Sequence, residues 1–356
     1  MPTRTEVRQI VGDHFNLGIT EDTSLEYAQA TVDVWKAIAP IVRERTYQHD
    51  GCDIRVQVDW EPIHLLLAEE LRDSLDLISE PPPGMVKKII YVRMSPEEIQ
   101  AANANREKSI PAYVEISGQN ELSNYNWYPE FFVETYLYDL FLVLNLAVPG
   151  SADFLNVTVH SMGHSPERLG LSAYYWWSAY QAKNQWPLLH VIDPSVVAAW
   201  FYNVRQGFAQ VPESSVERAL FAMLHVCRSG GRPEDIIWLF YAFESLFQTR
   251  VGENFSALLE RLQLILQPDS EQEKQLRKQL RAMYDLRSSF VHGGFSVIHP
   301  IHSEVMDKRV DDSYRRIIDL SEYGAKLLLA CLQRYIQEGW REVRYRTTVE
   351  PISSEF

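Results

Sequence analysis

Two side chains with complementary chemistry stand near the end of a helical pattern: Arg287 and, five positions later, His292. An imidazole titrates near neutral pH, so it can take a proton from a ribose 2′-hydroxyl or give one to a leaving 5′-oxygen. A guanidinium stays charged and can hold two phosphate oxygens while negative charge builds in the transition state. The pair therefore suits cleavage of an RNA phosphodiester with no metal or other cofactor.

The helix that carries this pair is predicted over residues 269–291, where apolar residues recur at spacings of three and four. Asp269 and Ser270 are candidate N-caps, and Gly293 is a candidate C′ glycine. Two residues five apart on a helix are rotated by roughly 140°, so the pair converges only if the helix ends or distorts at the histidine. The two glycines that follow supply the backbone freedom for such a break.

Spacing alone does not single out this pair. An arginine followed by four to six residues and a histidine also occurs at Arg8/His14, Arg43/His49 and Arg218/His225. The pair at the end of the predicted helix differs in its context, because a glycine pair follows it and a Tyr-x-x-Arg turn precedes it. The alternative is a histidine that only caps a helix.

Residues 284–293 read Tyr-Asp-Leu-Arg-Ser-Ser-Phe-Val-His-Gly. This run resembles the signature of HEPN ribonuclease domains, and most closely that of the ApeA-like group from bacterial anti-phage defence. A second segment, residues 236–247, resembles the helix of the same family that ends in an Ala-Leu-Glu-Ser-Leu-like run. The two motifs occur in the family's order, and the resemblance spans residues 213–338.

The resemblance implies that Arg287 and His292 are the catalytic pair, and that RNA is cleaved in a cleft to which each of two protomers donates one pair. It matches Glu244 to the family glutamate, which either positions the catalytic pair or stabilises its helix. Ser288 stands where many members have Asn, Asp or His, although a serine hydroxyl can still donate a hydrogen bond. Tyr284 opens the motif and is the remaining supporting residue.

The resulting hypothesis is a metal-independent endoribonuclease that acts as a homodimer through its HEPN bundle in abortive-infection defence. RNA is its substrate, and the expected products carry 2′,3′-cyclic phosphate and 5′-hydroxyl ends. The N-terminal part is expected to sense a phage-derived trigger. Two alternatives stay open: a catalytically inactive HEPN module that binds nucleic acid or nucleotide, and an interaction protein whose bundle only dimerises.

Length and composition predict an α+β protein of two domains, since 356 residues with 46% hydrophobic content can bury substantial cores. We expect a mixed α/β sensor domain at 1–192, an all-α helical bundle at 193–346 and a tail at 347–356. The net charge of −14 is uneven: residues 1–140 hold 24 acids and 12 bases, whereas residues 271–346 hold 11 acids and 14 bases. Any nucleic-acid surface is therefore expected in the C-terminal half.

Helical and strand patterns divide the chain accordingly. Helices are predicted at 24–45, 62–78, 96–108, 129–147, 195–209, 213–228, 233–249, 253–266, 269–291 and 311–338. Strands are predicted at 54–58, 86–94, 113–117 and 154–160. Further N-cap candidates are Ser214 or Ser215 and Asp311 or Asp312. The loop 293–310 either covers the catalytic pair or only connects two helices.

Metal, disulfide and membrane sites are not expected. The three cysteines are far apart and form no Cys-x-x-Cys pattern, which fits a reducing cytoplasm. The histidine pairs His160/His164 and His299/His302 have no accompanying carboxylate or cysteine cluster. Residues 131–148 are strongly apolar, but they include two acids, so a buried helix is favoured over a membrane span.

Overall fold

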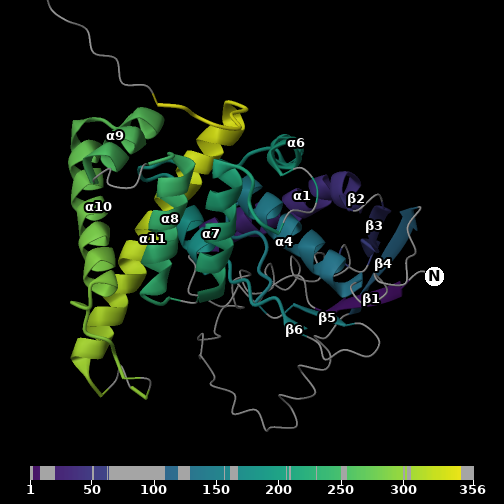
Figure 1. Cartoon of the computed structure of the whole chain (residues 1–356), viewed down its shortest axis with the longest axis horizontal. Helices are drawn as coiled ribbons and strands as arrows, with labels where there is room; N and C mark the ends of the chain where they lie inside the picture. The colour runs from purple at the N-terminus through teal and green to yellow at the C-terminus, as the bar shows by residue number, and fades with distance from the viewer. Residues whose placement is uncertain are drawn as a thin grey trace, which may run out of the picture.

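In the computed structural model, an antiparallel sheet lies at one side of the molecule and a helical bundle at the other (Figure 1). This arrangement confirms the predicted α+β class. The structure describes residues 3–8, 21–49, 52–63, 109–118, 129–160 and 167–345, except for 62, 156, 161–166, 206, 208–209, 230, 250–254, 300 and 303–305. The predicted helices at 62–78 and 96–108, the predicted strand at 86–94 and the tail at 347–356 lie almost entirely outside these residues.

The sheet has the strand order β2-β3-β4-β1-β5-β6, with every neighbouring pair antiparallel. Its strands are β1 (Thr3–Arg8), β2 (Glu44–His49), β3 (Cys52–Val58), β4 (Ser109–Gly118), β5 (Thr158–His160) and β6 (Glu167–Arg168). Alternate residues of β3, from Cys52 to Val58, are buried, which is the period of two of a strand with one face on a core.

Two long helices accompany the sheet: α1 (Glu21–Val42) and α4 (Pro129–Ala147). The predicted helix at 24–45 was too long at its C-terminal end, because Glu44 already pairs with Gln57 in the β2–β3 ladder. β1 was missed by the sequence analysis. Its pairing partners lie more than 100 residues away, at β4 and β5, so no local signal marks it.

Helix α4 begins at Pro129, as predicted from the tolerance of proline at a first helical position. From Phe132 onward it is buried almost throughout, which confirms the prediction of a buried helix. The helix ends at Ala147, and the Asn145 side chain holds the turn that follows by accepting a hydrogen bond from the Gly150 amide at 2.8 Å. Among the described residues, no helix is long and apolar enough to cross a membrane.

The rest of the described chain is helical: α5 (Tyr174–Gln181), α6 (Pro194–Val204), α7 (Ser215–Ser229), α8 (Glu234–Leu246), α9 (Phe255–Leu266), α10 (Ser270–Val291) and α11 (Lys308–Gln337). The bundle predicted from the helical pattern is therefore present. For α7, the Ser214 hydroxyl accepts from the Glu217 amide at 3.1 Å, so Ser214 is the cap. For α11, the predicted caps Asp311 and Asp312 are wrong.

The true cap of α11 lies one turn earlier. The Asp307 side chain accepts from the Arg309 amide, while Asp311 lies inside the helix and pairs with Arg315 at 2.8 Å. From there α11 runs diagonally across the bundle and contacts α5, α8, α9 and α10 (Figure 1). At Gly324 a side chain would meet Met283 of α10 and Leu239 of α8, so the small residue allows the three helices to approach closely.

Buried side chains from the sheet side and from the bundle form one continuous hydrophobic core. Gln333 of α11 joins the two sides: its amide nitrogen donates to the His190 carbonyl at 2.7 Å, and its carbonyl oxygen accepts from the His190 amide at 2.9 Å. The domain boundary at residue 192 stays a prediction, and it would divide a shared core.

Candidate functional site

Helix α10 begins and ends where the sequence predicts. Asp269 and Gln272 form a capping box at its N-terminus. At the other end His292 is the C-cap residue, and Gly293 has a φ of +74°, the left-handed conformation that favours glycine. Met283 and Leu286 are buried against the bundle. They fix the last turns of the helix and therefore the direction in which the motif side chains leave it.

Arg287 faces α8. Its Nη2 lies 3.2 Å from Glu244 Oε1 and 3.5 Å from Oε2, and its guanidinium carbon lies 5.5 Å from the ring centre of Phe240. The arginine side chain is 32% exposed and the glutamate side chain 38%. The guanidinium is thus held from one side by a carboxylate and a ring, while part of it remains open to solvent.

His292 is exposed at the helix end. Its backbone amide still donates to the Ser288 carbonyl at 3.0 Å, and its φ of −99° and ψ of 13° keep it close to the helical path. The break in the chain comes one residue later, at Gly293. His292 therefore leaves α10 roughly 140° around the helix from Arg287. A single chain directs the arginine toward α8 and the histidine toward solvent.

Besides Glu244, the other two supporting candidates, Tyr284 and Ser288, contribute to this geometry in different ways. The Tyr284 ring packs edge-on against Phe240 at 6.0 Å and Phe255 at 5.7 Å, one turn before the arginine. It joins α8, α9 and α10 beneath the motif. Ser288 is half-buried and supplies the carbonyl that holds the His292 amide.

The end of α10 and the segment that follows it expose several large apolar side chains: Val291 (56%), Val297 (80%), Ile301 (86%) and Met306 (89%). Two of its histidines, His299 and His302, make local side-chain hydrogen bonds. Nδ1 of His299 accepts from the Ile301 amide at 3.0 Å, and Nε2 of His302 lies 3.0 Å from the Tyr314 hydroxyl.

The described residues contain no group of three or more His, Cys, Asp or Glu side chains arranged to hold a metal ion. His164 of the other pair lies outside these residues. The three cysteines are buried and free, and burial raises the pKa of the Cys227 thiol to about 12.

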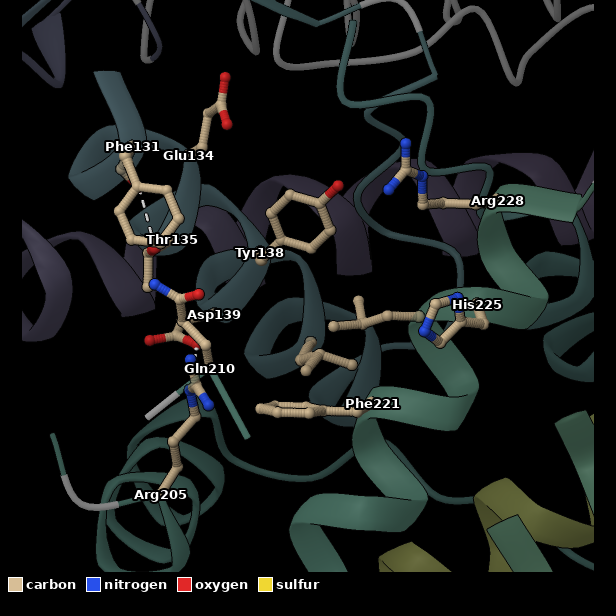
Figure 2. Close-up of a pocket in the computed structure, with 12 residues that line it drawn as sticks. Phe131, Glu134, Thr135, Tyr138, Asp139, Arg205, Gln210, Phe221, His225 and Arg228 are labelled. Carbon is tan, nitrogen blue, oxygen red and sulfur yellow. Dashed lines mark hydrogen bonds and ion pairs between the residues drawn. The ribbon is translucent and has the colours of Figure 1, made fainter. Parts of the chain in front are cut away.

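A second site, which the sequence analysis missed, lies between α4 and α7. A pocket of about 250 Å³ is lined from α4 by Phe131, Tyr138 and Leu142, and from α7 by Phe221, His225 and Arg228 (Figure 2). The residues on each helix are spaced three and four apart, so each set forms one stripe. The signal that could have revealed it is the presence of polar side chains within the apolar pattern of 131–148.

A buried ion pair closes one side of this pocket. Arg205 Nε lies 2.7 Å from Asp139 Oδ1, and both side chains are less than a tenth exposed. Burial raises the pKa of the Asp139 carboxyl, and the Arg205 guanidinium opposes this rise. The Tyr47 hydroxyl donates to the other carboxylate oxygen at 3.4 Å.

Comparison with known proteins leaves the identity open. No family model matches this chain, and no curated protein or solved structure matches it either. The function must therefore be inferred from the residues and their arrangement.

Proposed function

We propose that this protein is a metal-independent endoribonuclease of the HEPN type that acts as a dimeric effector in anti-phage defence. The observation that carries the proposal is the setting of Arg287: a guanidinium fixed by Glu244 and Phe240, yet partly open, one turn before an exposed histidine at the end of the same helix. A preorganised cation is what a phosphoryl transition state requires, because reorientation then costs nothing during the reaction.

In the proposed reaction the ribose 2′-oxygen attacks the adjacent phosphorus. The 2′-oxygen to phosphorus bond forms as the phosphorus to 5′-oxygen bond breaks. One imidazole removes the 2′-hydroxyl proton, and another group protonates the leaving 5′-oxygen. Arg287 binds the non-bridging oxygens, where negative charge increases. The products are a 2′,3′-cyclic phosphate and a 5′-hydroxyl, and water is not consumed in this step.

A second protomer completes the site in this proposal. The base and the acid act on opposite sides of the phosphorus, so a single histidine does not serve both. Within one chain, moreover, Arg287 and His292 leave the helix in different directions. The exposed apolar side chains of the 291–306 segment support an interface beside His292, because patches of this kind on a soluble surface mark contact sites.

RNA cleavage in the presence of EDTA tests the proposal. We expect His292→Ala and Arg287→Ala each to lower the cleavage rate by at least about 100-fold, the contribution typical of one acid–base or charge-stabilising group. Both residues are at the surface, so the melting temperature and the dimer should be unchanged.

Matched controls are available on the same surface. His302→Ala removes another exposed histidine, and Arg281→Ala removes the arginine that stacks on Phe255 from the same helix. Both controls should cleave like the wild type. Wild-type cleavage that requires a divalent metal, or full activity in either motif variant, would overturn the proposal.

The Arg287–Glu244 ion pair also favours a second candidate, a catalytically inactive HEPN module that binds nucleic acid or nucleotide. The carboxylate neutralises part of the guanidinium charge, so a phosphate must compete with it. This candidate predicts RNA binding that weakens in Arg287→Ala without any cleavage by the wild type. Dimerisation without RNA binding would leave only the interaction role.

A further inference from the structure

The pocket between α4 and α7 combines an apolar floor with a cation that has no ion-pair partner among the residues that the structure describes. Phe221 and Leu224 of α7 and Leu142 of α4 form apolar walls. Arg228 lies at the rim, with its guanidinium directed toward the Tyr138 hydroxyl across the opening (Figure 2). Within the described part of the chain, the structure contains no carboxylate within ion-pair distance of Arg228, unlike the other arginine of this pocket.

That other arginine is already neutralised. Arg205 pairs with Asp139 at 2.7 Å and lies with its guanidinium carbon 4.9 Å from the Phe221 ring centre. It therefore supports the aromatic floor and does not offer a free charge. The remaining basic side chain, His225, stacks flat on Trp238 of α8 at 4.1 Å. Burial and the nearby Arg228 lower the pKa of His225, which favours the neutral imidazole.

The Tyr138 hydroxyl and the Arg228 guanidinium lie on either side of the pocket opening (Figure 2). Burial raises the pKa of the Tyr138 hydroxyl; the positive charge of Arg228 opposes this rise, and the Glu134 carboxylate adds to it. A phenol hydroxyl and a guanidinium fork together suit one carboxylate or phosphate group. Glu134, the acidic residue of the same α4 stripe, points away from Arg228 (Figure 2).

We propose that this pocket binds a small aromatic anion, whose ring lies on Phe221 and whose single charged group is held by Arg228 and Tyr138. A volume of about 250 Å³ is slightly below the range of roughly 300–1,000 Å³ usual for ligand pockets, which limits the ligand to a small aromatic body of up to about three rings. The anionic group is a carboxylate or a phosphate. This inference does not depend on the ribonuclease proposal.

Two fluorescent probes separate the contribution of the ligand's charge to binding from that of its aromatic rings. Anilinonaphthalene sulfonate carries an aromatic body and an anion, whereas phenylnaphthylamine has the same body without the charge. We expect saturable binding of the sulfonate to the full-length protein. Arg228→Gln should weaken that binding roughly tenfold or more, the usual contribution of a hydrogen bond to a charged group, and leave phenylnaphthylamine unchanged.

Two further variants make the test specific. Leu224→Trp partly fills the pocket and should weaken the binding of both probes. Arg277→Gln removes an exposed arginine of α10, far along the chain from the pocket, and should change neither. Thermal melts of all variants check that the fold is kept.

Competition then distinguishes the two anions: naphthoate and naphthyl phosphate are each titrated against the bound sulfonate. Displacement by either one supports the proposal and names the preferred group. Equal sulfonate binding by wild type and Arg228→Gln, or unchanged binding of both probes in Leu224→Trp, would overturn it. Failure of both competitors to displace the sulfonate would overturn it as well.

Discussion

The two sites differ in what each lacks. The α10 terminus holds groups that can move a proton and stabilise a phosphate, but His292 is on an exposed helix end and Arg287 points elsewhere. The pocket between α4 and α7 has walls, a floor and an arginine, Arg228, that has no ion-pair partner among the described residues, but its histidine is stacked on Trp238. A catalytic pair on an open surface needs a second protein surface to enclose its substrate. An enclosed pocket can bind a ligand within one chain. Our two proposals therefore differ in the same way: the proposed catalysis needs a dimer, whereas the proposed ligand binding needs one chain.

Helix α8 connects the two regions. Trp238, near its N-terminal end, stacks on His225 of the pocket, and Glu244, near its C-terminal end, holds Arg287. Six residues on a helix span about 9 Å. Substitutions in the two regions should therefore separate the contribution of each region to stability and activity.

The largest effect on stability is expected at the pocket. Arg205→Met would leave the buried Asp139 carboxylate without its ion-pair partner, which typically costs about 3–5 kcal/mol of unfolding free energy. Denaturant unfolding measures the loss. The double variant Arg205→Met/Asp139→Leu should recover most of it, because no unpaired charge then remains. A double variant as unstable as the single one would contradict this account of the buried pair.

A smaller, pH-dependent effect is expected at the start of α8. Asp235 accepts hydrogen bonds from the Tyr175 hydroxyl at 2.6 Å and the Gly231 amide at 3.1 Å, and burial raises the pKa of its carboxyl to about 6. The folded protein then binds more protons than the unfolded chain between about pH 4 and pH 6. This group's contribution to stability is therefore present at low pH and is lost as pH rises through about 6, by up to about 2–3 kcal/mol.

Asp235→Asn removes this titration while it keeps an acceptor for Tyr175. We expect the variant to melt higher than the wild type at pH 7.5, with the difference shrinking toward pH 4.5. Asp193→Asn is a control of opposite sign, because hydrogen bonds from Ser195 lower the pKa of that exposed carboxyl. A pH-independent difference for Asp235→Asn would show that the carboxyl is not protonated in the folded protein.

The smallest effect on stability is expected at the motif. The Arg287–Glu244 pair is about one-third exposed on both sides, and exposed pairs contribute less than about 1 kcal/mol. Glu244→Gln should thus hardly change unfolding, yet it should lower kcat for RNA cleavage about tenfold, because the guanidinium loses its fixed position. The pH profile should keep its shape, since His292 is untouched. A shifted profile would point to Glu244 as a proton-transfer group.

The contrast between the regions also explains which features could be predicted from the sequence alone. The ends of α10 were predicted because a capping box and a C′ glycine act within a few residues of each other. The pocket was not predicted, because it depends on helices that begin at Pro129 and Ser215 and on an ion pair between positions 66 residues apart. The direction of Arg287 likewise depends on Glu244, 43 residues earlier in the chain. The caps of α10 could be predicted from local sequence, but the packing between distant segments could not.

The most direct test of the central claim is RNA cleavage by the purified protein in EDTA, with wild type beside His292→Ala, in the presence and absence of phage lysate. We predict cleavage by the wild type that leaves 2′,3′-cyclic phosphate and 5′-hydroxyl ends, and its loss in the variant. Cleavage that persists in His292→Ala, or no cleavage by the wild type under either condition, would contradict the assignment.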